Sequence, residues 1–430
     1  MRELLLNIRR PSDEIRRVVR RASSVVEVGR DTHESDGIES NPSACSARSV
    51  GSARSAWPFI AKVVVLSRIV AAIGLYRGHT SHAYLVSEGN SYVGVHNWWL
   101  NPWTYFDSQQ FLDLARLGYD EVRIAFFPLY PALLRLGGHS DVAMAGVGIA
   151  VSVVSFVGGL RFVYLWVRQE NNEATARRTV WLMAFFPMTV VWTSMYSEGL
   201  FLLLFAAFLW ALRSKRFALA VVLGLLTGAT RNTGLVISGA LVAEMIITEL
   251  RARRLHERAP FRWTYLVASL APLLSFVVFE AWVVNRYGLQ APRHAQELFS
   301  RQLHWPIWPI AKDLQSLAHP GFVTVLNLAA VGAGVAFAWR AIRNGRFFGG
   351  LLILGVLTMH LTFPTLNVPH ANGAARYLLP LIPFHFEVAD FIDRRASRLS
   401  STMRSVAMST WSLLALYVAL NIGHKYFAVG

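Results

Sequence analysis

The chain has 430 residues, of which 54% are hydrophobic and only 16% are charged. A soluble protein of this length carries charge on about a quarter of its residues, so the composition excludes an ordinary soluble protein. The formal net charge of +16 could suggest nucleic-acid binding, but the Lys and Arg residues fall in short clusters between apolar runs, as the positive-inside rule produces in membrane proteins. The sequence therefore predicts the lipid bilayer as a partner and no nucleic acid. A single cysteine, Cys45, excludes an intramolecular disulfide and a cysteine-based metal site.

Residues 1–56 are expected to form a separate cytoplasmic segment. Arginine pairs alternate with apolar positions near its start, which predicts a short basic amphipathic helix on the membrane surface. Serine dominates from Ser35 to Ser55, a composition typical of disorder. No apolar run precedes a small-residue cleavage site, which argues against a signal peptide. An over-extended start site is an alternative that the sequence leaves open.

Apolar stretches close to the roughly 20 residues needed to cross a bilayer recur along the rest of the chain. They predict an all-α polytopic membrane protein with a membrane domain at 57–422, about eleven crossings and a short outer tail at 423–430. The spans are expected at residues 57–76, 141–167, 179–194, 199–212, 217–230, 233–247, 265–284, 321–339, 347–363, from 374 to the arginines at 394, and 406–422.

The stretch from Phe217 to Ala240 has two interpretations. It could form one long helix with Arg231 buried inside it, which would place the basic cluster at 251–262 on the outer side. A hairpin broken at Arg231 instead places that cluster inside, and the positive-inside rule favours the hairpin.

The loop between the first two spans carries the densest set of acids and aromatic residues in the chain. Trp and Tyr collect at the membrane–water interface, where an acid is costly unless it is used. Near-helical spacing of four apolar residues predicts a short interfacial helix in this loop. These residues are Phe106, Phe111, Leu114 and Leu117.

Four charged residues fall at the outer ends of the predicted spans and are expected to face one cavity: Asp107, Glu198, Arg231 and Arg376. In transfer of a group to a hydroxyl, Asp107 could take the proton as general base. The planar guanidinium groups of Arg231 and Arg376 could hold a lipid phosphate. Glu198 could fix one of these arginines or bind an acceptor hydroxyl.

Each of these residues also has a structural interpretation. Asp107 could cap the interfacial helix, and Glu198 could simply begin the fourth span as an acid at a helix N-terminus. The two arginines could be ion-pair partners or lipid head-group anchors. The histidines lack ligand spacing, so neither a metal nor a cofactor is expected. Three further acids of the first outer loop could be solvated charges: Asp113, Asp120 and Glu121.

Several motifs, in consistent order over about residues 57–422, resemble those of the glycosylphosphatidylinositol mannosyltransferase II (PIG-V-like) family. They are Phe106-Asp107 followed by Phe111-Leu, Leu114-Ala, Gly118-Tyr119 and Ala125-Phe-Phe-Pro-Leu-Tyr-Pro131; Phe186-Pro187 with Tyr196-Ser-Glu198; Thr230-Arg231 with Gly234-Leu235; and Ala375-Arg376-Tyr377 with Pro380 and Pro383. The Trp-Asp of the family is Phe106-Asp107 here, which keeps the acid and changes its aromatic neighbour.

The resemblance implies a GT-C-type glycosyltransferase that takes mannose from a polyprenyl or dolichyl phosphate carrier. The acceptor would be a hydroxyl of a glycolipid, a glycan or a protein on the extracytoplasmic side of a prokaryotic cell membrane or of the endoplasmic reticulum. Transfer would invert the anomeric centre with one carboxylate base, Asp107, unlike the two-carboxylate chemistry of glycosidases. The residues that would contact substrate are Glu198, Arg231, Arg376, Tyr377, Tyr196, Tyr119 and Asp113.

Two other classes stay open. A transporter or lipid flippase would place polar residues near the bilayer midplane within two related halves, whereas this sequence shows no convincing internal repeat and gathers its polar set at one face. A non-catalytic subunit of a glycosylation complex would tolerate loss of Asp107, and its presence favours an active enzyme.

Overall fold

The computed structural model describes residues 56–81, 99–104, 107–255, 262–318, 321–366, 370–396 and 401–426. The predicted basic and serine-rich segment lies outside the described residues except for Ala56, and so do Phe106 and half of the outer tail. The division of the chain into domains therefore stays a prediction.

The described residues fold into helices and contain no strand beyond an isolated bridge between Arg301 and Thr365. The helices are α4 (Ala56–Ser81), α6 (Asp107–Leu117), α7 (Leu129–Leu134), α8 (Asp141–Glu170), α9 (Glu173–Ala184), α10 (Glu198–Arg213), α11 (Phe217–Gly228), α12 (Thr233–Arg254), α13 (Trp263–Tyr287), α14 (Ala291–Leu298), α15 (Ile307–Gln315), α16 (Phe322–Arg343), α17 (Phe347–Thr362), α18 (Ala374–Leu378), α19 (Ile382–Ala396) and α20 (Ser401–Tyr426).

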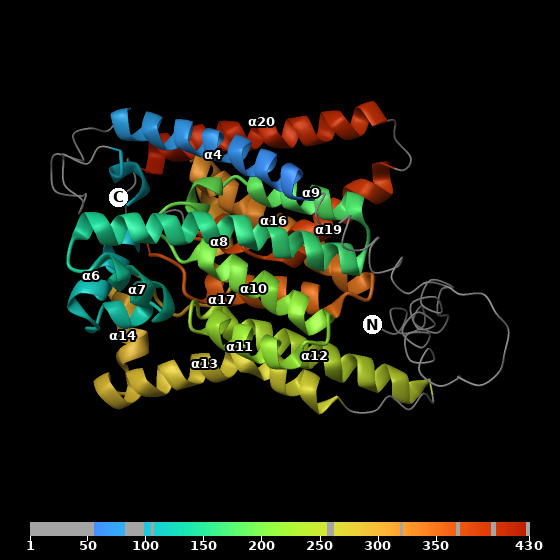
Figure 1. Ribbon diagram of the computed structural model, residues 1–430, viewed down its shortest axis with the longest axis horizontal. Helices are drawn as coiled ribbons and strands as arrows, with labels where there is room; N and C mark the ends of the chain where they lie inside the picture. The colour runs from blue at the N-terminus through green and yellow to red at the C-terminus, as the bar shows by residue number, and fades with distance from the viewer. Residues whose placement is uncertain are drawn as a thin grey trace. The chain divides into compact units, whose positions relative to one another are not determined.

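The long helices run side by side, and α8 packs against α10 in the middle of the bundle (Figure 1). Among the residues that the structure describes, five helical stretches are long and apolar enough to cross a membrane: Ala56–Arg77, Asp141–Glu170, Thr233–Arg254, Trp263–Tyr287 and Phe322–Arg343. Two shorter apolar helices are α11 and α17. The all-α membrane fold is thus confirmed, while the number of about eleven crossings stays a prediction.

The two ends of the bundle differ in character. Figure 1 shows α6, α7 and α14 at one end, which we call the site end. The helices α8, α10, α12 and α16 finish at the opposite end, which we call the basic end. Their last turns carry Arg168, Arg213, Arg251, Arg253, Arg254, Arg340 and Arg343. Cations at these positions also suit the negative end of each helix dipole.

Two predicted spans are not continuous helices, which corrects the sequence interpretation. In the third span, α9 ends at Ala184 and the chain continues irregularly past Pro187 into a short 3-10 helix, Thr189–Trp192. In the tenth span, Pro380 separates α18 from α19. Proline has no N–H to donate and clashes with the preceding turn, so it ends or kinks a helix.

The hairpin predicted at Arg231 is confirmed, because α11 and α12 are separate helices around it. Glycines allow the chain to turn here against α13. A Cβ on Gly228 would lie 2.1 Å from the carbonyl oxygen of Pro272, and one on Gly234 would lie 2.8 Å from the Cα of Gly228. This close packing leaves Arg231 at the tip of the turn.

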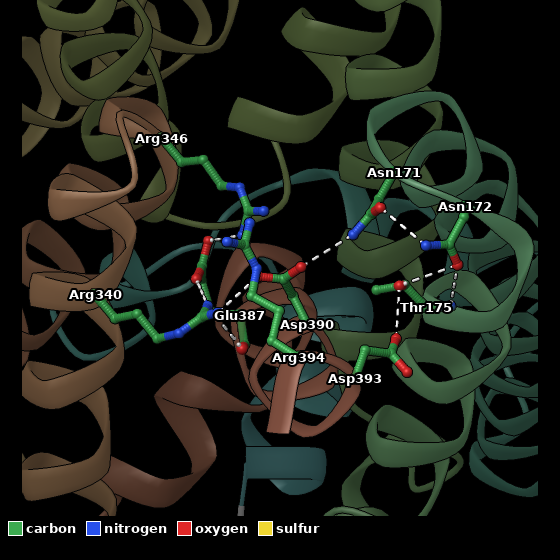
Figure 2. Close-up of polar contacts among 9 residues, drawn as sticks. All are labelled: Asn171, Asn172, Thr175, Arg340, Arg346, Glu387, Asp390, Asp393 and Arg394. Atoms are coloured by element: carbon green, nitrogen blue, oxygen red, sulfur yellow. Dashed lines mark hydrogen bonds and ion pairs between the residues drawn. The ribbon is translucent and has the colours of Figure 1, made fainter. Parts of the chain in front are cut away.

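At the basic end, buried acids of α19 hold neighbouring helices together (Figure 2). Arg346 Nη1 lies 2.7 Å from Glu387 Oε1 and 3.0 Å from Asp390 Oδ2, and Arg340 Nη2 lies 2.7 Å from Asp390 Oδ2. Asn171 donates to the other Asp390 oxygen at 3.1 Å. Because buried carboxylates are tolerated only when they are paired, this network fixes α16, α17 and the α8–α9 turn onto α19.

Candidate active site

The four charged residues expected to share a cavity do come together, and each is placed by the end of a helix. Asp107 is the first residue of α6 and Glu198 the first of α10, while Arg231 lies in the turn between α11 and α12 and Arg376 lies in α18. Helices that begin or end at one place bring residues far apart in sequence into contact.

Arg376 connects the two carboxylates of the cluster. Its Nη1 lies 2.6 Å from Asp107 Oδ2, and its Nε lies 2.6 Å from Glu198 Oε1. Arg231 Nη1 lies 2.7 Å from the same Glu198 oxygen and 3.3 Å from Ser197 Oγ. Glu198 therefore pairs with both arginines, whereas the sequence offered pairing with one of them as one of two possible roles.

The two carboxylates differ in exposure. The Glu198 side chain is 0% exposed, whereas that of Asp107 is 32% exposed. The second Glu198 oxygen, Oε2, is buried and has no hydrogen-bond partner among the residues that the structure describes. Buried polar atoms nearly always have a hydrogen-bond partner, so an unpartnered carboxylate oxygen at this position is unusual.

Two predicted tyrosines support the arginines. The guanidinium carbon of Arg376 lies 4.6 Å from the centre of the Tyr196 ring, and Tyr196 itself is buried. The Tyr377 ring lies 5.8 Å from the Arg231 guanidinium and is stacked on His360 with ring centres 4.2 Å apart. Cation–π contacts of this kind orient an arginine without neutralising it.

Sequence reasoning missed Arg301, whose guanidinium hydrogen-bonds the Tyr377 side chain. It lies in the stretch between α14 and α15, which runs antiparallel to the end of α17. His304 N donates to Thr362 O at 2.9 Å, and Arg301 bridges to Thr365. The only signal in the sequence was an arginine in a predicted outer loop.

Asp313 was also missed, and it acts on the site through the backbone. This buried residue of α15 accepts the N–H of His370 at 2.7 Å and that of Ala371 at 2.9 Å. The two bonds fix the segment that leads into α18, and they thereby position Arg376.

The structure does not support Asp113 as a substrate-binding residue or as a solvated charge. Asp113 is buried, with Oδ2 3.0 Å from Arg123 Nη2 and Oδ1 3.6 Å from Arg116 Nη2. Asp120 accepts the N–H of Arg123 at 2.8 Å with its side chain 46% exposed, and Glu121 is exposed, so these two are the surface charges expected. Asp113 therefore ties α6 to the chain that follows it.

Tyr119 has structural contacts, and its assignment to substrate binding stays a prediction. Its hydroxyl donates to the carbonyl of Phe126 at 3.2 Å, and its ring packs against Phe279 and Trp282 of α13. Partial burial raises the pKa of the Tyr119 hydroxyl well above its ordinary value. These contacts tie the first outer loop to α13.

The cluster lies inside the bundle rather than at its end. Ser152 of α8 donates to the carbonyl of Tyr196 at 3.0 Å, next to Glu198. Because α8 begins at Asp141, Ser152 lies roughly 16 Å along it at 1.5 Å per residue. The 30 residues of α8 span roughly 45 Å, which exceeds the roughly 30 Å hydrocarbon core of a bilayer. The cluster therefore lies level with the half of α8 that begins at Asp141, within the length of the helix that can span the membrane.

No group of three or more His, Cys, Asp and Glu residues in the described ranges lies close enough together to hold a metal ion. The site is instead built from carboxylates and guanidinium groups, with tyrosine and histidine rings beside them. Such a set can hold an anionic group, take up a proton and exclude water, and it supplies these functions from the chain's own residues.

Comparisons with solved structures give low identities. An oligosaccharyltransferase from Archaeoglobus fulgidus, tethered with an acceptor peptide, is 14% identical, with a TM-score of 0.44 over 86% of this chain and 55% of that chain. ArnT from Cupriavidus metallidurans, bound to undecaprenyl phosphate, is 13% identical, with a TM-score of 0.49 over 86% of this chain and 71% of that chain. This chain thus spans about half the length of the archaeal protein. No curated protein matches the sequence.

A family comparison gives a more specific match. The family model described as mannosyltransferase (PIG-V) matches residues 60–312. That range contains Asp107, Glu198, Arg231 and Arg301 and ends before Arg376. Because the match covers more than half of the chain and agrees with the motifs, the protein belongs to the mannosyltransferase (PIG-V) family of glycosyltransferases.

Proposed function

We propose that this protein transfers mannose from a polyprenyl- or dolichyl-phosphate carrier to a hydroxyl of a glycolipid, glycan or protein on the extracytoplasmic side of the membrane. The observation that carries the proposal is the cluster in which one accessible carboxylate, Asp107, lies 2.6 Å from an arginine that a buried carboxylate holds in place. Membership of the family supports mannose as the sugar.

Asp107 is the proposed general base. Of the two carboxylates, it is the one that an acceptor hydroxyl can reach, because Glu198 is fully buried. In the proposed step the hydroxyl oxygen attacks the anomeric carbon and gives its proton to Asp107. The bond from that carbon to the phosphate oxygen breaks, and the carrier phosphate leaves with the electron pair. A single displacement of this kind inverts the anomeric centre.

The arginines are the proposed phosphate clamp. Arg231 and Arg376 pair with two carboxylates, Asp107 and Glu198, and Arg301 beside Tyr377 adds a third positive charge, so the cluster has one positive charge in excess. An anionic phosphate would neutralise that excess, and guanidinium groups bind phosphate oxygens with two parallel hydrogen bonds. The leaving phosphate gains negative charge as the bond breaks, so the same groups would stabilise the transition state.

The depth of the cluster also fits a lipid-linked sugar. The cluster lies level with the half of α8 that begins at Asp141, which is where the phosphate of a carrier on the outer side would lie.

The proposal is tested by a transfer assay with the full chain purified and reconstituted in lipid. The donor is polyprenyl phosphate carrying radiolabelled mannose, and a crude lipid and glycan extract supplies acceptors. We expect label to move into a new product, and the same carrier with glucose to be used less well. If the labelled lipid instead changes leaflets in vesicles without any transfer, the protein is a flippase and the proposal is wrong.

Replacing Arg231 with alanine should weaken use of the donor more than binding of the acceptor. A hydrogen bond to a charged group contributes about 1.5–3 kcal/mol, so the donor KM should rise by roughly 10- to 150-fold. Arg231→Lys, which keeps the charge without the planar fork, should retain part of the affinity. The measurement is steady-state kinetics with each substrate varied in turn, and equal losses for both substrates would contradict the role as a phosphate clamp.

A further inference from the structure

A second site lies at the basic end of the bundle, away from the carboxylate–arginine cluster. It is a cavity of about 340 Å³ bounded by α8, α10, α12, α13 and α19 and by the α10–α11 and α16–α17 turns. Its walls are largely apolar and include Trp166, Leu241 and Phe386. Four cationic and three acidic side chains also line it, so their pairing decides what the cavity can hold.

Each of the lining carboxylates already has a partner. Glu170 Oε1 lies 2.9 Å from Arg213 Nε. Glu387 Oε1 lies 2.7 Å from Arg346 Nη1, and this second pair is drawn in Figure 2. Glu244 accepts a backbone N–H from the first turn of α17 at 3.2 Å. Each acid therefore has a partner, and two of the four cations, Arg213 and Arg346, are paired with acids.

The two remaining cations are Lys215 and Arg262, both exposed at the cavity. In the part of the chain that the structure describes, neither side chain has a carboxylate partner within ion-pair distance. With four cations and three acids on its lining, the cavity combines an apolar interior with one positive charge in excess, and Lys215 and Arg262 are the cations without a carboxylate partner among the described residues.

Lys215 has an unusual backbone conformation, which is seen by comparing its turn with the α16–α17 turn. The α10–α11 and α16–α17 turns share one geometry, in which the N–H of Arg216 and that of Arg346 each donate to the carbonyl five residues earlier at 2.9 Å. This is the helix-ending motif whose left-handed position favours glycine. Gly345 occupies it in one turn with φ 77°, but Lys215 occupies it in the other with φ 58°. A lysine at this position has a conformational cost, which indicates a use for its side chain.

We propose that this cavity binds the phosphate of an anionic phospholipid head group. Lys215 and Arg262 hold the phosphate, and the apolar walls receive the adjoining part of the lipid. Trp263, the first residue of α13, is 68% exposed beside Arg262, and exposed Trp marks the level of head groups. Basic pockets between membrane helices on the cytoplasmic side bind such head groups, and the positive-inside rule places the basic end there. The site is independent of the sugar-transfer chemistry.

The test is native mass spectrometry of the purified full chain in equal amounts of phosphatidylglycerol and phosphatidylcholine. We expect preferential retention of phosphatidylglycerol. A cation near an anionic lipid contributes about 1 kcal/mol, so Lys215→Gly and Arg262→Gln should each weaken that retention roughly fivefold. Lys215→Gly should fold normally, because glycine occupies the same position in the matching turn.

Arg254→Gln is the matched control, because Arg254 is an exposed cation in the last turn of α12 that does not line the cavity. An equal loss of phosphatidylglycerol in all three variants would show a general surface-charge effect and overturn the site. Full displacement of the lipid by soluble glycerol phosphate would show a phosphate site without lipid recognition and would also overturn the proposal. Loss confined to the two cavity variants, with glycerol phosphate a weak competitor, supports it.

Discussion

Replacing Asp107 with asparagine is expected to reduce transfer by about 10²- to 10⁴-fold, the range that a general base contributes. Asparagine has nearly the same size, and its side-chain oxygen can still accept the hydrogen bond that Arg376 now gives to Asp107 at 2.6 Å. The cluster should therefore stay assembled while the proton acceptor is lost. The measurement is the initial rate of mannose transfer in the reconstituted assay, together with the melting temperature in detergent.

The control for this variant is Glu121→Gln, which makes the same carboxylate-to-amide change in the same outer loop. Glu121 is exposed and lies outside the cluster, so its loss should leave the rate unchanged. A decrease of only a few fold for Asp107→Asn, with an unchanged melting temperature, would assign Asp107 to holding Arg376 rather than to taking the proton.

Replacing Glu198 with alanine is expected to have the largest effect on stability. Glu198 is fully buried and accepts from both Arg231 and Arg376, so its removal leaves two guanidinium groups without their shared counter-ion. Breaking a buried ion pair from one side costs about 3–5 kcal/mol. The purified variant should melt well below the wild type and should transfer little or no mannose.

Glu173→Ala provides the matched comparison, because Glu173 is also the first residue of its helix, α9. It pairs with Arg177 at 2.7 Å, but both side chains are more than 40% exposed. An exposed pair one helical turn apart contributes only about 0.3–0.5 kcal/mol. If the two alanine variants melted at the same temperature, Glu198 would not be the counter-ion that holds the arginines.

The phospholipid cavity and the transfer site can be tested separately because no residue of the carboxylate–arginine cluster lines the cavity at the basic end. Arg346 and Glu387, which line the cavity, also belong to the network that fixes α19. Changes there would disturb the fold, which is why the test of the cavity uses Lys215 and Arg262. These two residues have no part in the network of Figure 2.

Much of the helix arrangement was determined by the sequence itself. Apolar runs separated by arginine clusters predicted where most of the long helices lie, because a backbone in hydrocarbon must satisfy its hydrogen bonds within the helix. The distribution of Lys and Arg along the sequence also predicted the hairpin turn at Arg231, which the structure confirms. The gathering of Asp107, Glu198, Arg231 and Arg376 followed from the same rule, since alternate span ends share one face.

Local sequence was a poorer guide where the helices are interrupted. The third and tenth spans were expected to be continuous, yet each contains a break at a proline. Proline marks a possible end of a helix, but packing decides whether the chain resumes in the same direction. In this protein the breaks precede or follow residues of the cluster, Tyr196 and Tyr377, and so help to shape it.

Only the tertiary structure decided the roles of Asp113, Arg301 and Asp313. Asp113 looked like a solvated or substrate-binding acid, but Arg123 folds back and pairs with it. Arg301 reaches Tyr377 because its loop runs antiparallel to the end of α17, and Asp313 accepts backbone N–H groups more than fifty residues away in sequence. The sequence records which residues carry charge and where helices can form. The contacts between distant loops depend on how the helices pack, and no local pattern encodes them.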